Sequence, residues 1–257
     1  MDIYQLLLIT GGVVFVYVTI WFIVSLLLKR NDLADIAWGP GIFLVGLVGF
    51  FFSEGGLSLL VTILMGIWAL RLASRIAARN LKKKEDKRYI ELAKTWGRWF
   101  LLRSYLQVFL LQGLLMIFVG YPALHIAAFG SEMSVLVYVG LGLWLVGFFF
   151  EAVGDYQLDQ FLSKEENRGK IMRYGLWKYT RHPNYFGEVT QWWGIFLMVV
   201  SAPFGLVAFI SPLMITYLIL FVSGIPMLEK MFEGNPEFEE YKKRTSAFFP
   251  WFRKPVS

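Results

Sequence analysis

Long uncharged stretches separated by short polar segments dominate the pattern of hydrophobic and polar positions along this chain. The first stretch runs from Ile3 to Leu28 without one charged residue. About 18 consecutive apolar residues are enough to cross a bilayer as a helix. The run is too long for the hydrophobic part of a signal peptide, and Asp2 stands where such a peptide would be basic. We therefore expect a retained membrane-spanning helix here.

The whole pattern predicts seven membrane-spanning helices, with proline, glycine and charged residues between the apolar runs. The predicted spans are residues 3–28, 33–52, 57–78, 104–120, 133–153, 184–201 and 203–222. We take the stretch YPALHIAAFGSE, residues 121–132, as the connection that follows the fourth span. The last two spans are joined by a tight turn at residues 201–203.

The positions of the basic residues test this scheme, because cytoplasmic segments of membrane proteins collect Lys and Arg. All 25 Lys and Arg residues fall on one side of the seven spans. They occupy residues 29–30, 71–103, 164–181 and 230–254. The opposite side holds only Asp2, Glu54 and Glu132 as formal charges. The pattern predicts an N-terminus outside and a C-terminus in the cytoplasm.

Composition agrees with an all-α integral membrane protein that forms a single membrane domain over residues 1–257. The chain is 57% hydrophobic and 17% charged, with a mean hydropathy of +0.55, whereas soluble domains carry about 25% charged residues. With no cysteine and two histidines, we expect neither a disulfide nor a metal site. The net charge of +6 follows from the topology, so no nucleic-acid partner is expected. A basic cytoplasmic face would attract membrane lipids with anionic headgroups or a polyanionic cofactor.

Ionisable residues inside membrane spans are costly and usually face a partner, a bundle interior or a water-filled cavity. They occur at Asp35, at Arg71 and Arg75, at Glu151 and Asp155, and at Glu188, all in the predicted cytoplasmic half. If these positions converge, they line a polar cavity that opens to the cytoplasm. The alternative is ion pairing between helices, for example between Arg71 and Asp35 or between Arg75 and Glu151.

The stretch RHPNYFGE, residues 181–188, places charged and polar side chains where the sixth span begins. Pro183 favours a helix start, and the free N–H groups of a helix N-terminus attract anions. Arg181 and His182 add donors there, while Asn184 and Glu188 project along one face into the bundle. This arrangement suits a nucleotide-type cofactor with its phosphates at the surface and its polar end inward. A bound lipid headgroup is the alternative.

These residues also carry a family resemblance. RHPNYFGE, the preceding GLWKY, the upstream EAVGD, ADIAWG in the second span and the closing FEEYKKRTSAFFPWF resemble the membrane steroid 5-alpha-reductase family, most closely its bacterial branch. The resemblance implies that NADPH enters a cytoplasmic cavity in a seven-helix bundle, with residues 155–183 as the cofactor-binding segment. It implies that Asn184 and Glu188 hold the nicotinamide end. The candidate cofactor residues are Glu151, Asp155, Arg173, Tyr174, Tyr179, Arg181, His182, Asn184 and Glu188.

The catalytic residues implied by the resemblance are fewer. The steroid enzymes use a glutamate on the second helix and a tyrosine on the third to polarise the enone carbonyl. Asp35 falls near the position of that glutamate, but the third span reads IWALRLAS and has no tyrosine. We expect Arg71 to polarise the carbonyl, or a tyrosine from another helix to meet the oxyanion.

The sequence thus predicts an NADPH-dependent oxidoreductase of the bacterial inner membrane, acting on the CH–CH group of a steroid-like or isoprenoid enone. The hydrophobic substrate would enter from the bilayer, and we expect a monomer. The rival prediction is an S-adenosylmethionine-dependent membrane methyltransferase, because RHP-x-Y-x-G and the tail LEKMFEGNPEFEEYKKRTSAFFPW also resemble isoprenylcysteine carboxyl methyltransferases. In that case Glu229 would contact the amine of the cofactor. A non-enzymatic lipid-binding bundle is the second alternative.

Overall fold

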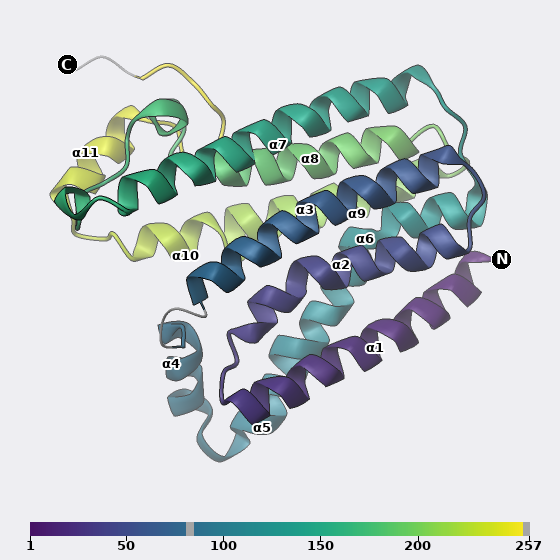
Figure 1. The fold of residues 1–257 in the computed structure, drawn as a ribbon, viewed down its shortest axis with the longest axis horizontal. Helices are drawn as coiled ribbons and strands as arrows, with labels where there is room; N and C mark the ends of the chain where they lie inside the picture. Colours follow the sequence, from purple (N-terminus) through teal and green to yellow (C-terminus); the bar gives the residue numbers. More distant parts are fainter. Residues whose placement is uncertain (81–84, 254–257) are drawn as a thin grey trace. The chain divides into compact units, whose positions relative to one another are not determined.

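The computed structural model describes residues 1–80 and 85–253, and these residues form helices and connecting segments without a strand (Figure 1). Lys82, Lys83, Lys84 and Lys254, which belong to the basic pattern of the sequence, lie outside the described residues. The chain divides into two compact units. The N-terminal unit comprises residues 1–133 and 199–211, and the C-terminal unit comprises residues 134–198 and 212–257.

Four long helices make up most of the N-terminal unit: α1 (Ile3–Leu28), α2 (Leu33–Phe51), α3 (Gly56–Asn80) and α6 (Leu111–Phe129). The second of them, α2, packs against α1, α3 and α6. A β-carbon at Gly49 on α2 would lie 2.6 Å from the carbonyl oxygen of Ala123 on α6. Glycine therefore allows these two backbones to approach, as small residues do between membrane helices.

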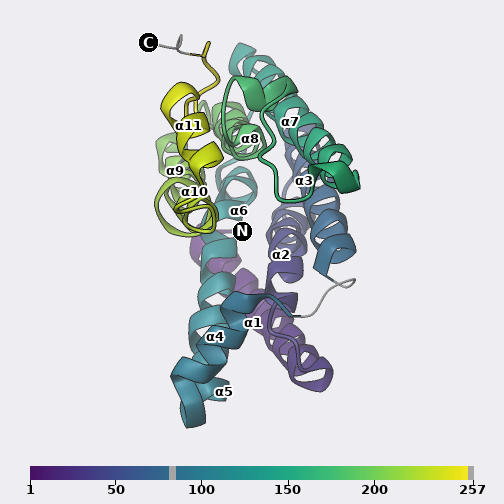
Figure 2. The same ribbon diagram turned by 90° about the vertical axis from the view of Figure 1, so that its left-hand side faces the viewer.

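Short helices connect α3 to α6 at the end of the unit where α1 ends and α2 begins (Figure 2). They are α4 (Lys87–Trp96), a 3₁₀ turn (Gly97–Trp99), α5 (Phe100–Arg103) and a π-helical stretch (Ser104–Leu110). A further 3₁₀ helix, Gly205–Phe209, also belongs to this unit.

The C-terminal unit is built on α7 (Val135–Leu162) and α8 (Pro183–Val199), which the segment 163–182 connects. This segment contains two 3₁₀ turns, Glu165–Asn167 and Gly175–Lys178. After α8 the chain forms α9 (Ile210–Tyr217), a π-helical stretch (Leu218–Val222), α10 (Ile225–Lys230) and α11 (Pro236–Arg244). Ile171, Phe238 and Tyr241 form a small buried core that joins α11 to the connecting segment.

Six stretches of the described chain are helical, long and apolar enough to cross a membrane, and the protein is an integral membrane protein. They are Ile3–Leu28, Leu33–Phe51, Gly56–Asn80, Arg88–Phe129, Val135–Leu162 and Gly205–Lys230. The predicted span 184–201 corresponds to α8, which has 17 residues and is not among the six. A seventh span and the orientation of the termini therefore remain predictions.

The predicted end of the fourth span at residue 120 is wrong. The helix continues through Pro122 to Phe129 and stops at Gly130, whose φ of 68° ends it. Proline is tolerated inside membrane helices because neighbouring groups satisfy the carbonyl that it leaves free. The continuation is buried: His125 is inaccessible, and its Nε2 lies 2.9 Å from the carbonyl oxygen of Pro203. The segment 121–132 is thus mainly helix.

The predicted end of the fifth span at residue 153 is also too early, because α7 extends to Leu162. The first residues of the predicted cofactor-binding segment 155–183 thus belong to this helix, and contacts with the connecting segment stabilise them. Trp177 donates its indole N–H to the carbonyl of Gly154, and Gln157 accepts the backbone N–H of Leu176. Asp155 therefore lies on the same helix as Glu151.

Candidate cofactor site and candidate catalytic cluster

The α7–α8 contact positions most of the predicted cofactor residues. A β-carbon at Gly147 on α7 would lie 2.6 Å from the carbonyl oxygen of Gly187 on α8, so the two backbones touch where both residues are glycine. One turn further along α7, Glu151 is 2% exposed and accepts a hydrogen bond from Nε2 of Gln191 on α8. The glycines thus bring a buried carboxylate and a buried amide together.

Asn184 lies in the first turn of α8, with its backbone against α7 at Gly154. Its side-chain oxygen is shielded from solvent, yet no described residue donates a hydrogen bond to it. The side-chain oxygen of Gln191 is likewise buried and receives no hydrogen bond from a described residue. Because buried polar atoms are nearly always paired, two unsatisfied acceptors on one helix indicate a place for a ligand that carries donors.

Glu188 and Asp155 lie on the same pair of helices, on α8 and α7, and are 9% and 4% exposed. Four of the predicted cofactor positions, Glu151, Asp155, Asn184 and Glu188, therefore lie on α7 and α8. The structure adds Gln191, which the sequence had not singled out.

Arg181 and His182 contact Glu229 of α10. The guanidinium of Arg181 reaches Oε1 of Glu229 at 2.8 Å and also donates to the backbone carbonyls of Lys242 and Thr245. Arg181 thus fixes the end of α11. It was expected to face a cofactor phosphate, and its donors are instead used largely within the chain.

His182 donates a hydrogen bond from Nε2 to Oε1 of Glu229 at 2.9 Å, since the carboxylate can only accept. Burial lowers the pKa of His182, although the contact with Glu229 opposes this shift. A neutral ring that is protonated on Nε2 leaves Nδ1 as an acceptor. Nδ1 is buried and receives no hydrogen bond from a described residue.

The remaining predicted cofactor residues lie in the connecting segment. Arg173 is partly exposed and lies 3.2 Å from a carboxylate oxygen of Glu237. Tyr174 is 62% exposed, and Tyr179 packs edge-on against Phe252. These three side chains are accessible to a ligand at the surface of the unit.

The C-terminal stretch is fastened to this connecting segment, which the sequence did not predict. Arg181 donates its backbone N–H to Ser246, Thr180 donates its hydroxyl to Phe248, and Trp251 donates its backbone N–H to Tyr179. The Tyr241 hydroxyl donates to the carbonyl of Trp177. Residues 241–251 therefore stabilise the segment that leads into α8.

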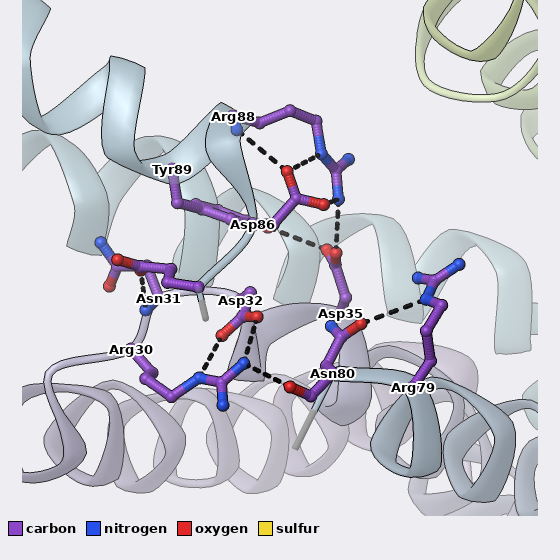
Figure 3. A network of polar contacts seen from close by, with 10 residues as sticks. Arg30, Asn31, Asp32, Asp35, Arg79, Asn80, Asp86, Arg88 and Tyr89 are labelled. Atoms are coloured by element: carbon purple, nitrogen blue, oxygen red, sulfur yellow. Dashed lines mark hydrogen bonds and ion pairs between the residues drawn. The ribbon is translucent and has the colours of Figure 1, made fainter. Parts of the chain in front are cut away.

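In the N-terminal unit, Asp35 is the centre of a polar cluster (Figure 3). It lies in the first turn of α2, and two residues of α4 contact its carboxylate. Arg88 donates from Nη2 to one oxygen at 2.7 Å, and the Tyr89 hydroxyl donates to the other at 2.8 Å. Both oxygens of Asp35 are therefore engaged.

A second group of polar contacts in Figure 3 holds the start of α2 in place. Arg30 forms a two-point ion pair with Asp32 and also donates to the carbonyl of Asn80 at the end of α3. The hydrogen bond to Asp32 raises the pKa of Arg30, so the guanidinium is charged. The backbone N–H of Asn31 donates to Glu85 at 2.6 Å. The connections before α2 and before α4 are thus fixed to one another.

Asp86, two residues before Arg88, forms an ion pair with it, with a carboxylate oxygen 3.1 Å from Nε of Arg88. Burial acts to raise the pKa of Asp86, but the hydrogen bonds from Arg88 outweigh it and lower the pKa. Asp86 is thus ionised and helps to aim the guanidinium at Asp35.

Arg71 lies half-buried on α3, one turn before Arg75. The described partners of Asp35 are Arg88 and Tyr89, which the sequence did not predict. The ED-x-RY pattern at residues 85–89 was the available signal, because it places one tyrosine among charged residues. Asp35 and Arg71 belong to the N-terminal unit and the cofactor positions to the C-terminal unit, so their convergence remains a prediction.

The described residues contain no group of three or more His, Asp or Glu side chains that could hold a metal ion.

Comparison with known proteins finds a match over residues 21–245 to the family described as "Protein of unknown function (DUF1295)". Among curated proteins, the chain is similar to 3-oxo-5-alpha-steroid 4-dehydrogenase 1 of Homo sapiens, 30% identical over 118 residues. That match covers 46% of this chain and 39% of the human protein. The protein of that name from Mus musculus is 40% identical over 58 residues, 23% of each chain.

These matched segments span less than half of the curated relatives' length. They confirm the predicted resemblance to the membrane steroid 5-alpha-reductase family. No solved structure matches the chain.

Proposed function

Since the chain belongs to the family DUF1295, and its curated relatives are steroid dehydrogenases, we propose that it is an NADPH-dependent membrane reductase. It transfers hydride to the conjugated C=C bond of a hydrophobic, steroid-like or isoprenoid enone. The substrate enters from the bilayer, and the enzyme resides in a bacterial inner membrane.

The observation that carries this proposal is the unsatisfied oxygen of Asn184 beside the buried carboxylates of α7 and α8. A nicotinamide carboxamide presents an NH₂ donor and a carbonyl acceptor. The Asn184 and Gln191 oxygens would accept from the NH₂ group. Glu188 and Glu151 lie on the same two helices, so the oxygens of Asn184 and Gln191 fit the NH₂ end of this group.

The phosphates and adenosine are assigned to the connecting segment. Arg173 offers a guanidinium at the surface, and Tyr174 and Tyr179 offer accessible rings. Arg181 is assigned a positioning role, because its guanidinium already holds Glu229 and the end of α11.

When bound, NADPH supplies the hydride, and one proton must come from the protein or from water. Asp35 and Tyr89 form a carboxylate and a proton-bearing phenol in direct contact, which suits proton delivery. Arg88 holds the carboxylate in place. Arg71 is assigned to polarise the substrate carbonyl, as the sequence analysis predicted.

The methyltransferase alternative is disfavoured by the surroundings of Glu229. In that reading Glu229 contacts the amine of S-adenosylmethionine, but its Oε1 already accepts from both Arg181 and His182. A cationic cofactor would have to displace or share these donors. The connecting segment is also basic, which suits phosphates better than a sulfonium.

The test is to purify the full chain in detergent and identify the ligand that accompanies it. We expect NADP(H), with its affinity reduced roughly 10- to 100-fold in Asn184→Ala and in Glu188→Gln, the range for a lost hydrogen bond to a polar or charged partner. The matched control is Glu239→Gln, an exposed carboxylate on α11. Retention of S-adenosylmethionine, or of lipid alone, would contradict the proposal.

A further inference from the structure

The C-terminal unit has a cavity of about 550 Å³ at the end of α11 that the proposed reaction does not use. Four cationic residues line it: Arg181, Lys242, Lys243 and Arg244. None of the described residues that line it is acidic. A cavity with this lining attracts an anion.

The cations of this cavity differ in how far they are already neutralised. Arg181 is ion-paired with Glu229, and Arg244 lies 2.7 Å from Glu240. Lys242 is 47% exposed, with its amine 3.9 Å from Glu229. Lys243 is exposed, and the described residues give it no ion-pair partner. The charge of Lys243 thus remains for a ligand, and that of Lys242 is paired only at the outer limit of an ion pair.

A second observation also indicates a ligand. Thr245, another lining residue, is 3% exposed, and its hydroxyl is buried without a hydrogen-bond partner among the described residues. Buried hydroxyls are normally satisfied. An anionic oxygen in the cavity would accept this hydrogen bond.

Three aromatic residues also line the cavity. Phe249, Trp251 and Phe252 line it and are 69%, 72% and 78% exposed. Large aromatic side chains exposed beside cations are typical of the membrane–water interface. The backbone hydrogen bond from Trp251 to Tyr179 fixes this stretch to the connecting segment, so the aromatic residues are held in place beside the cations.

We propose that this cavity binds the headgroup of an anionic phospholipid from the surrounding bilayer. The phosphate is held by Lys242, Lys243 and the Thr245 hydroxyl, and the aromatic side chains contact the glycerol and the upper acyl chains. Of the residues assigned a role in the proposed function, only Arg181, in its positioning role, lines this cavity, and the lipid site does not depend on the proposed reaction.

The experiment is a lipid titration of the detergent-purified full chain, followed by native mass spectrometry, with short-chain phosphatidylglycerol and phosphatidylcholine as probes. We expect phosphatidylglycerol to bind more tightly than phosphatidylcholine. Lys242→Gln with Lys243→Gln should weaken phosphatidylglycerol binding about thirtyfold, which is roughly fivefold for each lysine charge lost near an anionic lipid. Thr245→Val should weaken it by a smaller factor.

The matched control is Lys94→Gln with Lys164→Gln, two exposed lysines that do not line the cavity, and it should leave binding unchanged. Equal affinity for the two lipids, or equal effects of the two double variants, would overturn the proposal. So would displacement of phosphatidylglycerol by 2′,5′-ADP, because the phosphate in the cavity would then belong to a nucleotide.

Discussion

The carboxylate of Asp35 and the amide of Asn184 are both predicted site residues, and their surroundings differ. Both oxygens of Asp35 accept hydrogen bonds, from Arg88 and Tyr89. The side-chain oxygen of Asn184 is buried and accepts none from the described residues. A satisfied group is held in one geometry by its own chain, whereas an unsatisfied buried group lacks a partner that a ligand can supply. The contrast supports the proposal that Asp35 takes part in the chemistry and Asn184 in cofactor binding.

The largest expected effect is that of Asp35→Asn. The amide keeps the shape and can still accept from Tyr89, but it removes the charge opposite Arg88 and the proton-accepting carboxylate. We expect turnover of an enone substrate to fall by 10² to 10⁴, the range of general acid–base catalysis, while NADPH remains bound. Unchanged turnover would remove Asp35 from the catalytic residues.

Tyr89→Phe sharpens the same point, because it deletes only the hydroxyl that contacts Asp35. We expect kcat to fall roughly 100-fold, with a shifted pH profile and an unchanged NADPH affinity. Tyr105→Phe is the matched control, since Tyr105 also hydrogen-bonds within the N-terminal unit, to Thr19 at 2.9 Å. Equal losses in the two variants would show that Tyr89 acts only on stability.

Glu229→Gln tests whether Arg181 and His182 are held by an internal contact. The change leaves a buried guanidinium without its counter-charge, and we expect about 3 kcal/mol of destabilisation, as for a broken buried ion pair. Thermal unfolding in detergent measures it. Glu240→Gln, which breaks the half-exposed pair with Arg244, should cost less than about 1 kcal/mol. Similar costs would contradict a structural role for Glu229.

Asn184→Ala should behave in the opposite way to Glu229→Gln. Because the Asn184 oxygen has no described partner, its loss should change the unfolding temperature little. The variant should nonetheless weaken NADPH binding about tenfold. A large loss of stability with unchanged binding would reverse the assignment.

The smallest expected effect is the pH dependence set by His182. Burial lowers the pKa of His182 below its usual 6.5, so the unfolded chain binds a proton more readily than the folded one. Stability should therefore fall as the pH drops below about 6.5. Glu229 and Arg181 lie beside the His182 ring, and the Tyr185 ring stacks on it with 5.6 Å between the ring centroids. Unfolding temperatures at pH 7.5 and 5.5 should differ less in His182→Gln than in the unchanged chain.

The sequence was sufficient for features that depend on local pattern. The uncharged run Ile3–Leu28 predicted α1 residue for residue. An apolar run of this length between charged residues crosses a bilayer as one helix, so the charges mark its ends. Pro183 likewise predicted the start of α8. The same reasoning failed at Pro122. A buried helix can continue through a proline when neighbouring groups satisfy the carbonyl that the proline leaves free.

Contacts between residues far apart in the chain were not predictable in this way. Asp35 was found as a charge inside an apolar run, but its partner Tyr89 is 54 residues away. Glu229 accepts a hydrogen bond from His182, which lies 47 residues earlier in the chain. No spacing rule links such pairs, because they depend on how the helices pack. Arg181 was therefore expected to bind phosphate, and its contact with the end of α11 was missed.

The central claim is that the α7–α8 site binds NADPH, and a competition titration tests it most directly. NADPH fluorescence would be followed as the nucleotide is added to the purified chain, with and without excess S-adenosylmethionine. We predict saturable binding that S-adenosylmethionine leaves unchanged and that Asn184→Ala weakens. Displacement of NADPH by S-adenosylmethionine, or saturable binding of S-adenosylmethionine alone, would contradict the account.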